Sequence, residues 1–112
     1  MLSDSEPTGD QLLRLLAALG STQRLRIVAA LVPGRNYVSQ LARDLQMSRP
    51  LLHLHLQRLE RAGLVRGSLE LSDDGKAMKY FEVTPFHVAL SPALIARAVE
   101  SLSAESDDTE GR

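Results

Sequence analysis

The chain has 112 residues, 44% of them hydrophobic, and no cysteine, which fits about one domain and excludes disulfides, thiolate metal sites and thiol redox chemistry. It contains no run of eighteen apolar residues, and its acidic start lacks the pattern of a secretory leader, so we expect a cytoplasmic protein that does not contact membranes. The net charge of −1 is unevenly spread, because residues 10–102 hold 12 basic and 8 acidic residues, a balance that allows nucleic acid as a partner.

The first predicted helix carries more apolar surface than a single small protomer needs. Residues 1–9 are expected to be a disordered lead, and residues 11–19 then consist almost entirely of Leu and Ala, which are strong helix formers. A helix that is apolar nearly all round is buried on more than one side, which indicates a second subunit. The leucines that wrap this helix are Leu12, Leu13, Leu15, Leu16 and Leu19.

A second helix is predicted over residues 21–31. Gly20 breaks the first helix, Ser21 is a good N-cap, and Pro33-Gly34 follows the end of the second helix. Tyr37-Val38 is a candidate for a short extended segment. The inward face of the second helix is expected to carry Leu25, Val28, Ala29 and Leu31.

Two helices joined by a tight turn come next. We expect Ser39 to cap a helix that ends near Leu45, and Ser48 to cap a second helix that continues to Ala62. Pro50 stands in the first turn of this second helix, where its missing N–H costs little. Gly63 is the expected left-handed residue after the helix. The inward stripe of the second helix is Leu52, Leu56 and Leu59.

A β-hairpin and a last helix complete the pattern. Residues 68–71 and 78–83 carry β-forming side chains on either side of a turn with Asp-Gly. Ser91-Pro92 opens a helix that continues to about Leu102, and residues 103–112 are expected to be an acidic disordered tail. The order α-α-α-α-β-β-α predicts a mainly α domain with a small β-hairpin over residues 10–102, which is a winged helix-turn-helix.

Three segments of the chain resemble the ArsR/SmtB-type winged-helix regulators: Leu19–Leu31, Ser39–Val65 and Gly75–Thr84. The stretch HLQRLERAGLV carries the most specific part of this resemblance. The resemblance implies a homodimer built from the first and last helices, with paired recognition helices on a palindromic operator in double-stranded DNA, and repression as the typical outcome. The predicted dimer interface consists of Leu12, Leu13, Leu16, Leu94, Ile95, Ala98, Val99 and Leu102.

The helix that begins after Ser48 is the predicted recognition helix, whose first turns reach base edges in the major groove. Arg49 suits guanine, Gln57 suits adenine, and His53 suits a base or a phosphate, whereas Leu51 or Leu54 suits a thymine methyl group. Further arginines supply contacts to phosphates. The candidate DNA-binding residues are Ser48, Arg49, Pro50, Leu51, His53, Leu54, His55, Gln57, Arg58, Arg61, Lys76 and Lys79.

Some of these candidates have a second interpretation. His55 fits a phosphate contact as well as a half-buried histidine bonded to the backbone, and Arg61 fits a pair with Asp44 or another acidic residue. Lys76 and Lys79 flank the hairpin turn and fit either DNA contacts or solvated side chains. The acidic pair Asp73-Asp74 at the same turn would repel phosphate, which also favours an alternative function: a winged-helix adaptor that binds proteins without specific DNA readout.

The residues that catalysis or metal binding would need are not grouped in this sequence. It has no nucleophile–His–acid set and no Gly-rich phosphate loop, so an enzyme is not expected. His53 and His55 diverge by about 200° on a helix and cannot chelate one ion. The stretch that carries cysteines in metal-sensing relatives has none here, and the last helix offers only Glu100 as a ligand. We therefore expect no metal and no cofactor, and an unidentified small-molecule effector stays open as a partner.

Overall fold

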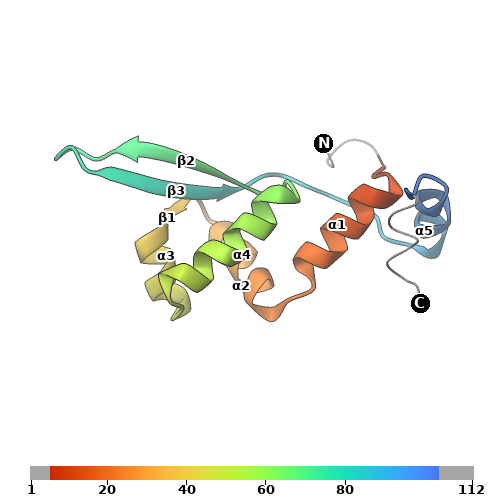
Figure 1. Cartoon of the computed structure of the whole chain (residues 1–112), viewed down its shortest axis with the longest axis horizontal. Helices are drawn as coiled ribbons and strands as arrows, with labels where there is room; N and C mark the ends of the chain where they lie inside the picture. Colours follow the sequence, from red (N-terminus) through yellow and green to blue (C-terminus); the bar gives the residue numbers. More distant parts are fainter. Residues whose placement is uncertain (1–5, 104–112) are drawn as a thin grey trace. The chain divides into compact units, whose positions relative to one another are not determined.

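The computed structural model describes residues 6–103, which fall into two compact units. Unit 1 combines the chain up to Ala17 with the chain from Pro85 onward, and unit 2 is Ala18–Thr84. The predicted domain limits at residues 10 and 102 stay a prediction, and the predicted acidic tail lies outside the described residues except for Ser103. The elements in chain order (Figure 1) are α1 Gly9–Leu19, α2 Thr22–Leu31, β1 Asn36–Tyr37, α3 Val38–Leu45, α4 Arg49–Arg61, β2 Val65–Leu71, β3 Ala77–Val83 and α5 Pro92–Val99.

Residues 6–8 precede α1 and take part in the contacts that fix its start. Thr8 and Gln11 form a reciprocal capping box: the Gln11 side chain accepts from the Thr8 N–H (2.9 Å), and the Thr8 hydroxyl accepts from the Gln11 N–H (3.2 Å). Glu6 pairs with Arg97 of α5, and the Gly9 N–H donates to the Ser101 hydroxyl (2.8 Å). These contacts join the start of α1 to α5.

The last helix is shorter than predicted. α5 begins as expected, with the Ser91 hydroxyl accepting from the Leu94 N–H (3.1 Å), but it ends at Val99 instead of near Leu102. After that point the N–H groups of Glu100, Ser101 and Leu102 bond three residues back instead of four. The final turn therefore tightens in the way that commonly satisfies the last carbonyl groups of a helix.

Unit 2 buries a face of α2 that agrees with the prediction at Leu31, leaves Val28 partly buried and differs at the other positions. The buried residues are Arg24, Ile27 and Leu31, whereas Leu25 is 54% exposed and Ala29 is exposed. Ser21 caps the helix as predicted, through a hydrogen bond from the Arg24 N–H (3.3 Å). The inward stripe is shifted by one residue because Arg24, a charged residue, lies on the buried side and finds hydrogen-bond acceptors there.

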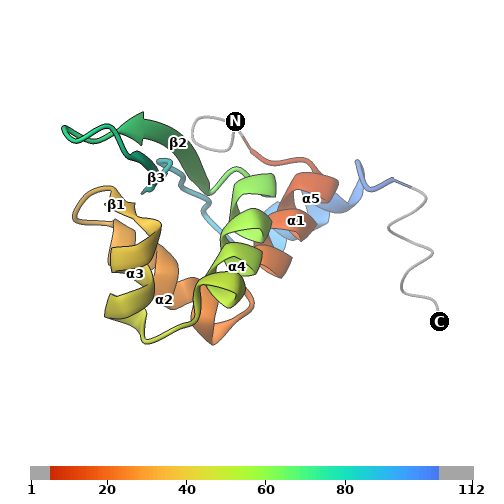
Figure 2. The same cartoon turned by 60° about the vertical axis from the view of Figure 1, so that its left-hand side comes forward.

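The predicted helix-turn-helix is formed by α3 and α4, which Figure 2 shows as neighbouring helices joined by a short turn. α3 starts one residue before Ser39, and its N-cap is Tyr37, which makes no side-chain cap bond. Gln46 ends α3 in the left-handed conformation (φ 55°). The Ser48 hydroxyl caps α4 by accepting from the Leu51 N–H, and Gly63 follows the helix with φ 78°, both as predicted.

The wing is a three-stranded antiparallel sheet with the order β1-β3-β2, so it contains one strand more than the predicted hairpin. β1 pairs Asn36 with Phe81 and Tyr37 with Tyr80, because the chain before α3 is extended and lies beside β3. Phe81 is buried on the face that continues into the core, and Gly75 (φ 86°) lies in the turn between β2 and β3. The hairpin reaches out past α3 (Figure 1).

Candidate nucleic-acid interface

The recognition helix α4 is fixed to unit 2 by its leucines and exposes its opposite side. Leu52, Leu56 and Leu59 are fully buried, as predicted. Because the outward positions lie on the opposite side of the helix, the side chains proposed to read DNA are available to solvent in this structure. These exposed residues are Arg49, Pro50, Leu51, His53, Leu54 and Gln57.

The start of α4 is a well-defined helix terminus. Ser48 is exposed, but its hydroxyl accepts from the Leu51 N–H (3.3 Å), so the side chain serves first as a cap. Pro50 occupies the first turn without losing a helix hydrogen bond. The cap and the proline fix the direction in which the first turn of α4 leaves the turn after α3.

His55 is held by α2 and does not point freely outward. Arg24 Nη1 donates to His55 Nδ1 (3.1 Å), and the same guanidinium donates through Nε to the Ala18 carbonyl (2.6 Å). Burial, reinforced by the positive charges of Arg24 and Arg58, lowers the pKa of His55 below its usual value. A half-buried histidine was one of its two interpretations, but its partner is a side chain of α2 rather than the backbone.

Arg58 and Arg61 are exposed on the last two turns of α4, beside the exposed Glu60. The alternative pair between Arg61 and Asp44 is not present, because Asp44 accepts instead from Gln40 Nε2 (2.7 Å) and Asn36 Nδ2 (3.4 Å). Within residues 6–103 neither arginine has an ion pair. Both remain suitable for contacts to phosphates.

The wing offers less positive charge than its sequence suggests. Lys76 and Lys79 are exposed, and Lys79 Nζ lies 5.6 Å from the centre of the Phe81 ring. A hydrogen bond from the Ser72 hydroxyl lowers the pKa of Asp74, so this carboxylate stays charged at the turn. The negative charge at the turn weakens any contact between the wing and phosphate.

Two arginines elsewhere on unit 2, Arg35 and Arg66, form ion pairs with glutamates on the sheet. Arg35 pairs with Glu70 and lies 4.3 Å from the centre of the Tyr80 ring, and Arg66 pairs with Glu82. Glu82 stands opposite Arg66 in the β2–β3 register, which explains this second pair. These arginines are therefore poor candidates for contacts to DNA.

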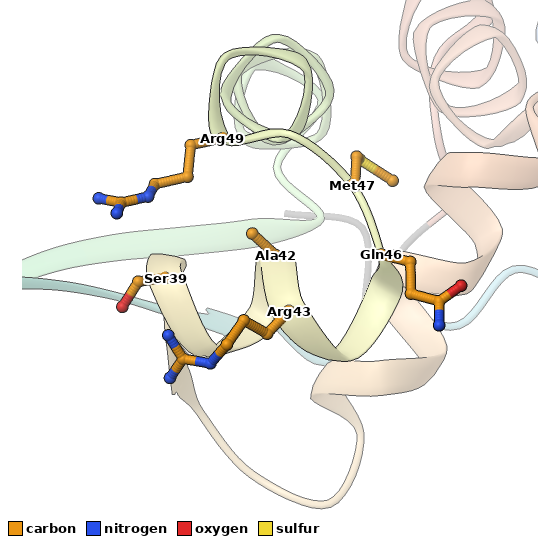
Figure 3. A pocket seen from close by; sticks show the side chains of 6 residues that line it. All are labelled: Ser39, Ala42, Arg43, Gln46, Met47 and Arg49. Carbon is orange, nitrogen blue, oxygen red and sulfur yellow. The ribbon is translucent and has the colours of Figure 1, made fainter.

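A hollow between α3 and the start of α4 brings together residues that the sequence patterns did not connect. It has a volume of about 330 Å³ and is open to solvent, and Figure 3 shows Ser39, Arg43 and Arg49 extending to one side of it. Arg43 was not among the predicted DNA-binding residues. The available signal was its spacing, since it lies four residues after Ser39 and outside the apolar stripe of α3. The hollow is lined by Ser39, Ala42, Arg43, Gln46, Met47 and Arg49.

The predicted dimer residues of unit 1 differ in how far they are buried. Leu12, Leu94 and Ala98 are buried within the chain, and thus serve its own core instead of an open surface. Leu102 is partly buried beside Gly9. The remaining four are exposed apolar side chains on α1 and α5: Leu13, Leu16, Ile95 and Val99.

Residues 6–103 offer neither a metal site nor a membrane span. No three His, Asp or Glu side chains in this described range lie close enough together to hold a metal ion. No helix in the same range is long and apolar enough to cross a membrane.

Comparison with known proteins places this geometry in a family. The model of bacterial regulatory proteins of the arsR family matches residues 21–66. An uncharacterised HTH-type transcriptional regulator of Methanocaldococcus jannaschii is 29% identical over 84 residues, which cover 75% of this chain and 87% of that protein. The residues that match the family model include α2, α3 and α4, so the similarity extends over the whole helix-turn-helix.

Solved structures agree with this assignment. The crystal structure of a possible transcriptional regulatory protein from Mycobacterium bovis has a TM-score of 0.58 and 30% identity, covering 66% of this chain and 74% of that chain. The solution structure of a homodimeric winged helix-turn-helix domain from Mycobacterium bovis, a possible ArsR-family regulator, has a TM-score of 0.59 and 24% identity, covering 90% and 82%. The chain belongs to the ArsR family of bacterial regulatory proteins, which are regulators of transcription and not enzymes, and it has the winged helix-turn-helix fold.

Proposed function

We propose that this chain regulates transcription by binding double-stranded DNA as a homodimer, with α4 in the major groove. The observation that carries the proposal is the division of α4 into a buried leucine stripe and an exposed side with His53, Leu54 and Gln57. A helix anchored on one side and polar on the other, at the second position of a helix-turn-helix, is suited to reading base edges. The resemblance to the family favours repression as the outcome.

The homodimer is supported by apolar side chains that unit 1 leaves open to solvent. Leu13 and Leu16 on α1, and Ile95 and Val99 on α5, are each more than 40% exposed. Burial of such side chains is worth about 25 cal/mol per Å². The related domain from Mycobacterium bovis is itself described as homodimeric. A two-fold dimer would place two recognition helices about 34–36 Å apart, on a palindromic operator.

The dimer can be tested by sedimentation of the wild type and of Leu16→Glu. We expect a dimer at micromolar concentration for the wild type and a folded monomer for the variant, because a charge at this position is costly to bury. Gln23→Glu, at an exposed position of α2, is the matched control and should stay dimeric. A wild type that sediments as a monomer at these concentrations contradicts the proposal.

DNA binding can be tested by electrophoretic shift with the DNA upstream of the chain's own gene. We expect the wild type to prefer this DNA over random duplex at moderate salt. His53→Ala and Gln57→Ala should each lower that preference, by about 1–3 kcal/mol for each base that the variant no longer reads, while Gln23→Ala should not. Equal binding to both duplexes would remove the proposed readout.

The finer parts of this proposal concern partners. We place the protein in the cytoplasm, where a bacterial regulator binds DNA, and leave the small-molecule effector unidentified.

The adaptor alternative has one observation in its favour, since Leu69 (68% exposed) and Leu71 (75% exposed) lie on the wing near Asp73 and Asp74. A protein partner that is captured equally well by Arg49→Ala and by the wild type, in a chain without DNA preference, would favour the adaptor.

A further inference from the structure

The hollow between α3 and α4 carries positive charge that the described part of the chain does not neutralise. Arg43 donates through Nη2 to the amide oxygen of Gln40 (2.6 Å), which is a neutral acceptor. The Arg49 side chain has no hydrogen bond or ion pair within residues 6–103. Asp44, the acidic residue of α3, is engaged by Gln40 and Asn36.

Three arginines outside the hollow have an acidic partner among the described residues, unlike the two that line it. Arg35, Arg66 and Arg97 each have a glutamate partner. The lining of the hollow, by comparison, holds two guanidinium groups, a serine hydroxyl and no carboxylate. Such a donor set suits an oxyanion, because guanidinium and hydroxyl groups both donate hydrogen bonds and guanidinium carries the opposite charge.

The position of the hollow within the helix-turn-helix indicates which oxyanion would bind there. In a helix-turn-helix the first helix crosses the DNA backbone while the second enters the groove. Arg49 is the first residue of α4, and Figure 3 shows its side chain extending to the same side as Arg43 and Ser39 of α3. Because Arg49 extends toward α3 instead of along the exposed side of α4 (Figure 3), it lies next to the helix that crosses the backbone.

We propose that Arg43 and Arg49 together bind one phosphodiester group of the DNA backbone, with the Ser39 hydroxyl as a further donor. The inference rests on the proposed function and revises the expectation that Arg49 reads guanine. Arg49 positions α4 in the groove, and base readout is left to His53, Leu54 and Gln57. Arg43, which the sequence did not single out, becomes part of the interface.

The test compares salt dependence with sequence preference for Arg43→Gln, Arg49→Gln and the double variant. The logarithm of the binding constant falls with the logarithm of salt concentration, with a slope of about −0.9 for each phosphate neutralised. Because the homodimer would lose one phosphate contact in each half-site, we expect the slope of the double variant to be shallower by about 1.8, twice 0.9, while its ratio of affinities for upstream and random DNA stays unchanged. Arg35→Gln is the matched control, since Arg35 is paired with Glu70, and its slope should equal that of the wild type.

Ethylation interference locates the contact on the DNA. One phosphate in each half-site whose ethylation blocks the wild type should no longer matter to the double variant. Arg43 and Arg49 are exposed, so the variants should melt at the temperature of the wild type. An unchanged salt slope in the double variant overturns the proposal, as does a loss of preference at one base pair in Arg49→Gln. A wild type that binds no DNA overturns the proposed function as well, so the two failures are distinguishable.

Discussion

Arg24 is expected to be a structural residue that holds three segments of unit 2 together. It is 8% exposed, and its guanidinium donates to the Ala18 carbonyl at the C-terminal end of α1 and to His55 of α4. The last carbonyl groups of a helix lack partners within the helix and carry partial negative charge. Replacing Arg24 by Met keeps an unbranched apolar stem while removing both hydrogen bonds.

The magnitude follows from what the substitution leaves behind. A hydrogen bond to a charged group contributes about 1.5–3 kcal/mol, and a buried acceptor left unpaired costs about 1–3 kcal/mol. Removing the guanidinium also removes the cost of burying its charge, which offsets part of the loss. The Ala18 bond, which is buried, should dominate over the part-buried His55 bond. We expect Arg24→Met to lower the free energy of unfolding by about 2 kcal/mol.

Urea unfolding at fixed protein concentration measures this change. With a slope of roughly 1–3 kcal/mol per molar urea, the midpoint should fall by about 1 M. Arg26→Met is the matched control, because Arg26 is exposed on the same helix and should change the free energy of unfolding by less than about 0.5 kcal/mol. If Arg24→Met lowered the free energy of unfolding no more than this control, the hydrogen bonds of Arg24 would not stabilise unit 2 as we expect.

Three further predictions concern single positions. The lowered pKa of His55 means that the folded state disfavours its proton, so the stability it contributes is present at neutral pH and lost as pH falls below about 6.5; urea midpoints should show a loss that His55→Gln lacks. Gly9→Ala should destabilise by about 1–3 kcal/mol, because the added Cβ meets the Ala98 carbonyl and the Leu102 side chain (2.8 Å). Gly63→Ala should lower the free energy of unfolding by about 1 kcal/mol because of its positive φ. Gly34→Ala is the control, since Gly34 has open space around it and the substitution should not destabilise. Equal melting temperatures for the Gly9, Gly63 and Gly34 variants would contradict both the steric argument and the argument from φ.

The starts of α2, α4 and α5 were predictable because their signals are local, whereas the predicted cap Ser39 lies inside α3. Ser21, Ser48 and Ser91 stand at helix starts and accept hydrogen bonds from N–H groups three residues later, as the capping pattern predicts. The leucine stripe of α4 repeats at helical spacing and fixes which side faces solvent. Local chemistry and periodicity agree for α4, and the prediction of its exposed side is confirmed.

The sequence-based predictions fail where long-range contacts decide. Periodicity predicts that Leu25 faces inward because it is apolar. In the structure Arg24 is buried in its place and forms hydrogen bonds with Ala18 and His55, while Leu25 is exposed. β1 is only two residues long and overlaps the extended candidate Tyr37-Val38, but its pairing with β3 is a long-range contact that no local pattern indicates. Thr8 and Gln11 have the spacing of a capping box, but the residues before them are polar, so this spacing does not stand out in the sequence.

The pairing of arginines explains how a chain of net charge −1 can present a positive surface. Exposed ion pairs contribute little to stability, so Arg35–Glu70, Arg66–Glu82 and Arg97–Glu6 matter mainly for where charge remains. The hydrogen bond from Arg35 lowers the pKa of Glu70, and that from Arg97 lowers the pKa of Glu6, so these pairs stay ionised. Within residues 6–103, the arginines without an ion pair include Arg43 on α3 and Arg49, Arg58 and Arg61 on α4, as well as Arg26 on α2. The pattern of paired and unpaired arginines shapes the field of the molecule, and under the proposed function this field favours the approach of DNA to the helix-turn-helix.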